Sequence, residues 1–238
     1  MQSATHFIPI FTCLISIAFA SVLYRRWANK KSATYLLWWT IGALVFGLGT
    51  LTEALTALIG WNLVVFKLWY ISGALLGGAP LAQGTVYLLF SKKTANIMTI
   101  VLVAYVAVAA ICVALSPVNY ALVEPNRLSG QVLVWSWARL FSPFVNTYAL
   151  VFLAGGALWS AWKYVKKGVR GSRVIGNVLI AVGALLPGIG GSFTRLGHVE
   201  VLYVTEFIGI VLIWTGYRVM STDLAVSIHA SQQEARSI

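Results

Sequence analysis

The sequence predicts an all-α integral membrane protein, built as a bundle of seven transmembrane helices. Of the 238 residues, 59% are hydrophobic and only 10% are charged, and the mean hydropathy is +0.84. A water-soluble domain of this size does not need so much apolar surface. Apolar runs of roughly 20 residues, the length that crosses a bilayer, recur along the chain. We therefore expect a multi-pass protein of the cell inner (plasma) membrane, with the lipid bilayer as its main partner.

The first apolar run, residues 7–24, is expected to be a retained helix. No basic residue precedes it, whereas Arg25 and Arg26 follow it, and a cleavable signal peptide has the opposite charge order. The predicted transmembrane helices are 5–25, 33–59, 63–91, 95–116, 137–165, 172–196 and 200–221. They make one transmembrane domain, 1–222, followed by a short polar cytoplasmic tail, 223–238, which we expect to be a frayed helical extension or disordered.

The longest connection between predicted helices, 116–134, is expected to form an ordered external loop. It contains Pro117, Pro125 and Gly130, so it cannot be one continuous helix.

The basic residues predict the orientation of the chain. They concentrate in the first, third and fifth connections, and cytoplasmic loops of membrane proteins are enriched in Lys and Arg. The N-terminus is therefore expected outside and the C-terminus in the cytoplasm. The residues assigned to the cytoplasmic side are Arg25, Arg26, Lys30, Lys31, Lys92, Lys93, Lys163, Lys166, Lys167, Arg170, Arg173, Arg218 and Arg236. The net charge of +11 is thus explained by topology and anionic lipid, and no nucleic-acid partner is expected.

Glycine and proline lie within the predicted helices as well as between them. Small residues let helix backbones approach closely in lipid, so packing is the expected role of the glycine clusters. Pro80, Pro143 and Pro187 each interrupt a predicted helix. The resulting bends are compatible with a cavity or with simple accommodation within the bundle, and both interpretations stay open.

Five ionisable residues are predicted inside the outer third of the membrane, on different helices. They are Glu53, Lys67, Arg139, Arg195 and Glu206. Charged groups in a span are costly and persist mainly where they face a cavity or a partner. We expect Glu53 to pair with Lys67 and Glu206 with Arg139 or Arg195, which leaves a net positive pocket for a small anionic or zwitterionic ligand. Polar residues expected at nearby depths are Thr50, Tyr70, Gln83, Asn146 and Tyr203.

A structural role is the alternative for the same residues. Ion pairs can hold helices in register, and long basic side chains can reach the membrane surface from within a span.

Several functional classes lack the residues that they need. Cys13 and Cys112 lie in apolar runs, without a second cysteine or a histidine at metal-ligand spacing. No histidine pair is placed to bind haem, and the last predicted helix has no lysine for a retinal Schiff base. No phosphate-binding loop, nucleophile elbow or zinc-protease helix is present. We therefore expect no enzyme activity, cofactor or metal.

A resemblance to a known family supports a sensory interpretation. The stretch from Trp38 and Trp39 through Glu53 to Trp69, Tyr70, Gly73, Pro80 and Phe90 resembles the amino-terminal seven-transmembrane sensor region of some bacterial membrane histidine kinases. The segment 183–187 and the Asp223-Leu224 pair are also similar to that region. The resemblance implies a ligand- or membrane-sensing module in standalone form, since the chain ends where such a protein continues into its signalling helix and kinase domain. Of the ionisable residues, the resemblance covers only Glu53.

The leading hypothesis is a receptor-like or sensory membrane module for signal transduction. It would bind a small molecule or lipid in an outward-facing polar pocket and signal to a separate membrane or cytoplasmic protein. One alternative is an accessory structural subunit of a larger membrane complex, docked through its glycine-rich faces. A third is a small proton-coupled transporter that uses Glu53 and Glu206, although no inverted repeat is evident.

Overall fold

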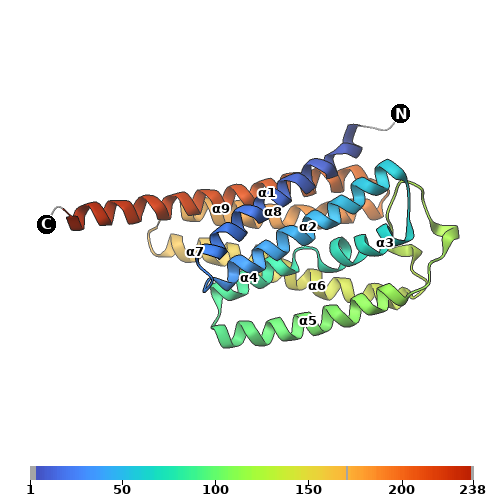
Figure 1. The fold of residues 1–238 in the computed structure, drawn as a ribbon, viewed down its shortest axis with the longest axis horizontal. Helices are drawn as coiled ribbons and strands as arrows, with labels where there is room; N and C mark the ends of the chain where they lie inside the picture. Colours follow the sequence, from blue (N-terminus) through green and yellow to red (C-terminus); the bar gives the residue numbers. More distant parts are fainter. Residues whose placement is uncertain (1–3, 170, 237–238) are drawn as a thin grey trace.

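The chain folds into an all-helical bundle, which confirms the predicted fold class. The computed structural model describes residues 4–169 and 171–236, of which residues 4, 6, 195 and 223–236 are described by backbone only. Within this part, seven helical segments are long and apolar enough to cross a membrane (Figure 1). They are Ile8–Asn29, Thr34–Ile59, Leu63–Leu89, Lys92–Leu115, Ser136–Lys166, Ser172–Thr194 and Val199–Thr222.

Four of these spans are single helices, and two are composite. The single helices are α1 (Ile8–Asn29), preceded by the short 3-10 helix η1 (Ala4–Phe7), then α2 (Thr34–Ile59), α5 (Lys92–Leu115) and α8 (Ser172–Arg195). The third span consists of α3 (Leu63–Trp69), the π-helix η2 (Tyr70–Leu76) and α4 (Ala79–Leu89). The fifth consists of the 3-10 helix η5 (Ser136–Leu140), α6 (Phe141–Ala149), the π-helix η6 (Leu150–Gly155) and α7 (Gly156–Lys166).

The last span belongs to a longer helix, α9 (Val199–Arg236), which projects beyond the other helices (Figure 1). The sequence predicted a transmembrane helix that ends near residue 221, followed by a tail that is a frayed helical extension or disordered. Of these two alternatives, the structure has the helical extension, because the helical backbone continues to Arg236. No glycine or proline occurs between Tyr217 and Arg236, so no residue there opposes the continuation of the helix.

The two ends of the bundle differ in their connections, and we name them accordingly. The loop end has the connections 60–62, 116–135 and 196–198, and the basic end has 30–33, 90–91 and 167–171. At the loop end, Asn62 caps α3 by accepting hydrogen bonds from the backbone of Val64 (2.9 Å) and Val65 (3.3 Å). At the basic end, the Ser91 hydroxyl caps α5 through Thr94 (3.2 Å). Such caps satisfy helix N–H groups that have no partner inside the helix.

The third span breaks at Gly77, three residues before the predicted interruption at Pro80. Gly77 has φ of +44° and ψ of −120°, a conformation that residues with a Cβ strongly disfavour. Pro80 lies in the first turn of α4, where the missing N–H costs nothing. Pro143 similarly lies in the first turn of α6, whereas Pro187 lies inside α8 without ending it.

We expect Gly77→Ala to destabilise the protein by about 2 kcal/mol, because the methyl group forces a strained backbone at this break. The added Cβ would also lie 3.2 Å from the Asn146 Oδ1 atom. Gly78→Ala is the matched control, since Gly78 has φ of −85° and an added Cβ would make only ordinary contacts, at 3.6 Å or more. Thermal unfolding in detergent measures both variants. Equal stability of the two would show that the break does not depend on glycine.

Helices α8 and α9 pack through glycines spaced seven residues apart. A Cβ added at Gly183 would lie 2.6 Å from the Gly209 carbonyl oxygen, and one added at Gly216 would lie 2.4 Å from that of Gly176. At Gly190 it would lie 2.0 Å from the Thr205 hydroxyl oxygen. The two backbones are therefore in direct contact along most of the bilayer, as in other helix pairs packed through small residues.

The buried side chains form two clusters. One joins α1, α2, α4, η6, α7, α8 and α9 around Phe19, Trp39 and Tyr217. The other joins α3, η2, α5 and α6 with the 116–135 loop, around Phe66, Tyr70 and Val132.

Candidate functional site

Glu53 lies on α2, about two turns before its loop end, and only 4% of the residue is exposed. Its Oε1 atom accepts a hydrogen bond of 3.0 Å from the indole N–H of Trp69. Two glycines one turn away make this contact possible. A Cβ at Gly49 would lie 3.2 Å from the Gly73 Cα atom, so α2 and the third span approach closely there. One turn nearer the loop end, the same approach brings Trp69 to Glu53.

Glu206 reaches the same point from α9. Its carboxyl group lies within hydrogen-bonding reach of the Glu53 carboxyl group. Each acid also has one buried oxygen, Oε2, with no hydrogen-bond donor among the described residues. Two acids from separate helices therefore meet inside the bundle, and Trp69 donates a hydrogen bond to one of them, Glu53.

Tyr203 completes the group that we call the acid pair site: Glu53, Trp69, Tyr203 and Glu206. Tyr203 is buried, with 3% exposure, and lies close enough to both carboxyl groups to interact with them electrostatically. Glu200, one turn earlier on α9, adds a third acid near Tyr203. Among the described side chains, this end of α9 is therefore acidic.

The expected ion pairs between this site and Lys67 or Arg139 are wrong. The Lys67 ammonium instead donates a hydrogen bond to the backbone carbonyl of Ala114, near the C-terminus of α5. A cation is favoured there, because the last carbonyls of a helix lack partners. The Arg139 guanidinium donates to the Ser136 carbonyl in its own helical turn (3.3 Å). The described ion pairs include neither residue.

The other predicted site residues also divide between several places. The side chain of Arg195 lies outside the described part of the chain. Tyr70 is buried in the second cluster, where the Ser142 hydroxyl approaches its hydroxyl group at 3.5 Å. The Asn146 amide donates to the Ala74 carbonyl (3.2 Å), next to the break at Gly77. Tyr203 and Glu206 thus join Glu53, whereas Lys67, Tyr70, Arg139 and Asn146 do not.

A second polar cluster lies toward the basic end, around Gln83. This side chain is fully buried and donates to the Ala95 carbonyl (3.1 Å) and the Thr99 hydroxyl (2.8 Å) of α5. The Tyr148 hydroxyl donates to its Oε1 atom. Gln83 was expected near the outer pocket, but its two partners on α5 lie near the start of that helix, toward the basic end. With Tyr148 of α6, it joins α4, α5 and α6 there.

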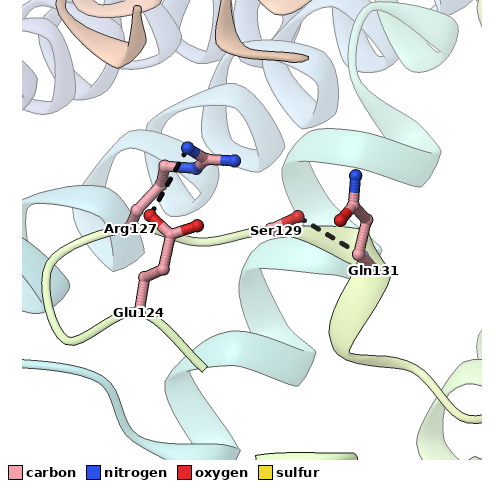
Figure 2. Close-up of polar contacts among 4 residues, drawn as sticks. All are labelled: Glu124, Arg127, Ser129 and Gln131. Carbon is pink, nitrogen blue, oxygen red and sulfur yellow. Dashed lines mark hydrogen bonds and ion pairs between the residues drawn. The ribbon is translucent and has the colours of Figure 1, made fainter. Parts of the chain in front are cut away.

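The 116–135 loop is ordered, as predicted, and covers the loop end beside α3 and α5. It contains an isolated antiparallel bridge between Val118 and Leu133, and Leu128 is buried against the second cluster. Figure 2 shows two of its local contacts. Arg127 pairs with Glu124 at 3.4 Å, and the backbone N–H of Gln131 donates to the Ser129 hydroxyl at 3.3 Å.

Sequence reasoning missed the role of Trp69, which it named as part of the family resemblance and not among the site residues. No spacing rule relates a tryptophan on one helix to a glutamate on another. The glycines at 49 and 73 were the available indication that these two helices approach closely, but their pairing was not predictable.

Comparisons with known proteins identified no relative of this chain. No family model, no curated protein and no solved structure matches the chain.

Proposed function

We propose that this protein is a sensory membrane module whose sensing element is the acid pair site. The observation that supports this proposal is that the carboxyl groups of Glu53 and Glu206 lie within hydrogen-bonding reach of each other inside the bundle. Neither acid has a basic partner among the described side chains. The packing of two such acids therefore depends on whether a proton or a cation neutralises their charge.

The chemistry of the site favours a cationic ligand. Two negative charges about 4 Å apart repel by about 4 kcal/mol at the effective dielectric constant of a protein, so both carboxylates do not persist in contact without compensation. A proton shared between them, or a small cation, removes the repulsion. The expectation of an anionic or zwitterionic ligand is replaced, because Lys67 and Arg139 point to other partners.

Orientation and helix length support signalling from outside to inside. The distribution of Lys and Arg favours a loop end that faces outward and a basic end that faces the cytoplasm. Helix α9 carries Glu206 near its start and runs for 38 residues, or about 57 Å at ~1.5 Å per residue. A change of packing between α2 and α9 would therefore move a helix that extends past the basic end to a separate protein partner. The resemblance to kinase sensor regions favours the same interpretation.

We expect the distance between α2 and α9 at the loop end to depend on pH in the wild-type protein. Spin labels at Ile59 on α2 and Val204 on α9, both exposed, would report it after Cys13 and Cys112 are replaced by alanine. Raising the pH until the neutralising proton is lost should separate the labels, because two carboxylates in contact repel each other. Glu53→Gln with Glu206→Gln should remove the dependence, since neutral amides do not titrate. A second pair of labels at Lys31 and Thr222 tests whether the change reaches the basic end.

The matched control is Glu124→Gln, which removes an acid at the same end of the bundle but outside the site. It should retain the full pH dependence. A wild-type distance that stays constant with pH and with added small cations would overturn the proposal.

The contacts of the glycines do not favour the alternative that the protein is an accessory subunit of a larger complex. It assumed that glycine-rich faces dock against partner helices, but Gly49, Gly73, Gly183 and Gly209 all face helices of the same chain. Of the glycines at 183, 188, 190 and 191 on α8, only Gly188 and Gly191 face open space.

A further inference from the structure

A groove runs along the outside of the bundle between α1 and α9. Two adjoining hollows of about 360 Å³ and about 310 Å³ form it, and they share Ile15 as a lining residue. From α1 the groove is lined by Ile8, Phe11, Leu14 and Ile15. From α9 it is lined by Phe207, Val211, Trp214, Thr215, Arg218 and Val219.

The α9 side of the groove is one helical stripe that ends in a charge. Phe207, Val211, Trp214 and Arg218 follow one another at intervals of four, three and four residues, so they share a face of the helix. The first three are apolar or aromatic, and Arg218 is the basic residue at the end. Arg218 forms no described ion pair.

A second arginine is held beside the same end. Arg26 of α1 donates hydrogen bonds to the Tyr217 hydroxyl (3.1 Å) and the Ser221 hydroxyl (2.7 Å) of α9. Its guanidinium lies 5.3 Å from the centre of the Tyr217 ring. The contacts fix a positive charge where α1 and α9 reach the basic end, on Tyr217 and Ser221, which are one and three residues from Arg218 along α9.

The length of the groove matches one leaflet of a bilayer. From Phe207 to Arg218, α9 rises about 16 Å at ~1.5 Å per residue, and half of a hydrocarbon core of ~30 Å is about 15 Å. Apolar walls over this length suit an acyl chain, and the two arginines suit a phosphate, which guanidinium groups bind through several hydrogen bonds.

We propose that the groove between α1 and α9 binds one acidic phospholipid, with an acyl chain along the apolar stripe and the phosphate at Arg218 and Arg26. The site is separate from the acid pair site and does not depend on its function. A transmembrane helix from a partner is the less suitable occupant. Large side chains such as Phe11, Leu14 and Trp214 line the groove, whereas close helix contacts use small residues, and a partner would also have to present an acid to Arg218.

The test is native mass spectrometry of the purified protein in a neutral detergent, titrated with phosphatidylglycerol or with phosphatidylcholine of the same acyl chains. We expect the wild-type protein to retain one phosphatidylglycerol molecule about tenfold more tightly than phosphatidylcholine. Arg218→Gln should weaken phosphatidylglycerol binding about fivefold and leave phosphatidylcholine unchanged, because one basic contact to an anionic headgroup is lost. Val211→Trp should fill the groove and weaken both lipids.

The control is Lys92→Gln with Lys93→Gln, which removes two charges at the basic end away from the groove and should leave both affinities unchanged. Equal wild-type affinity for the two lipids would overturn the proposal. So would an equal loss of phosphatidylglycerol in the Arg218 variant and the lysine control, since that result indicates a diffuse charge effect. A stable dimer that Val211→Trp dissociates would assign the groove to a second copy of the chain instead.

Discussion

Gly183→Ala is expected to lower the free energy of unfolding by about 1 to 3 kcal/mol, the usual cost of overpacking a well-packed contact. The new methyl group would lie 2.6 Å from the Gly209 carbonyl oxygen and 3.1 Å from the Ile213 backbone nitrogen. Both atoms belong to the backbone of α9, so no side-chain rotation relieves the clash. The two helices must separate, and the contacts at Gly176 and Gly190 are then weakened as well.

Gly188→Ala on the same helix is the matched control, with an expected effect of opposite sign. A Cβ there meets nothing within 4 Å, and alanine is favoured over glycine inside a helix by about 0.5 to 1 kcal/mol. Unfolding of both variants in the same detergent, followed by loss of helical circular dichroism, measures the difference. Stabilisation by both substitutions would contradict the close packing of α8 against α9.

Gln83→Leu is expected to destabilise the protein by about 2 kcal/mol, with three interhelical hydrogen bonds lost at an average of ~0.6 kcal/mol each in a membrane protein. Leucine has a similar size, so the cavity contribution is small. The loss would fall on the Ala95 carbonyl, the Thr99 hydroxyl and the Tyr148 hydroxyl. The Tyr148 hydroxyl would be left inside the bundle without this acceptor, which adds a desolvation cost.

Two further variants distinguish the loss of the Gln83 hydrogen bonds between helices from the loss of any buried polar group. Tyr148→Phe removes only one of the bonds to Gln83 and should cost less than half as much. Thr40→Val changes another buried polar residue, but the Thr40 hydroxyl bonds to the Leu36 carbonyl in its own helix (2.8 Å), so the expected effect is a few tenths of a kcal/mol. An equal effect of Gln83→Leu and Thr40→Val would show that Gln83 does not join the three helices.

The helical spans were predictable because each depends on local composition. A run of apolar residues long enough to cross the bilayer must form a helix there, since every backbone polar group has to be satisfied within the segment. Residues 34–59 are an example, with the predicted helix 33–59 and the observed helix differing by one residue. The break at Gly77 was harder to locate, because the sequence has glycine at 73, 77 and 78 and proline at 80, and composition does not show which of them adopts the positive φ that Gly77 has.

The site was only partly predictable. The depth of a residue in the membrane follows from its position along one helix, but the direction of its side chain depends on how all the helices pack. The sequence placed Glu53, Lys67, Arg139 and Glu206 at a similar level, and Glu53 does meet Glu206. It could not show that Lys67 turns toward α5, where the Ala114 carbonyl accepts its hydrogen bond. A rotation of about 100° per residue separates neighbouring positions on a helix, so an equal depth leaves the direction of each side chain undetermined.

The sequence by itself determined that this chain has seven spans, an excess of basic residues at one end and a few costly polar groups within the spans. Only the tertiary structure decided that two acids meet without a described basic partner, because that contact depends on which helices are neighbours. The close glycine contacts, Gly49 with Gly73 and Gly183 with Gly209, join helices that follow one another in the chain. Glu53 and Glu206 instead lie on α2 and α9, which are far apart in the sequence, so only the three-dimensional packing brings them together.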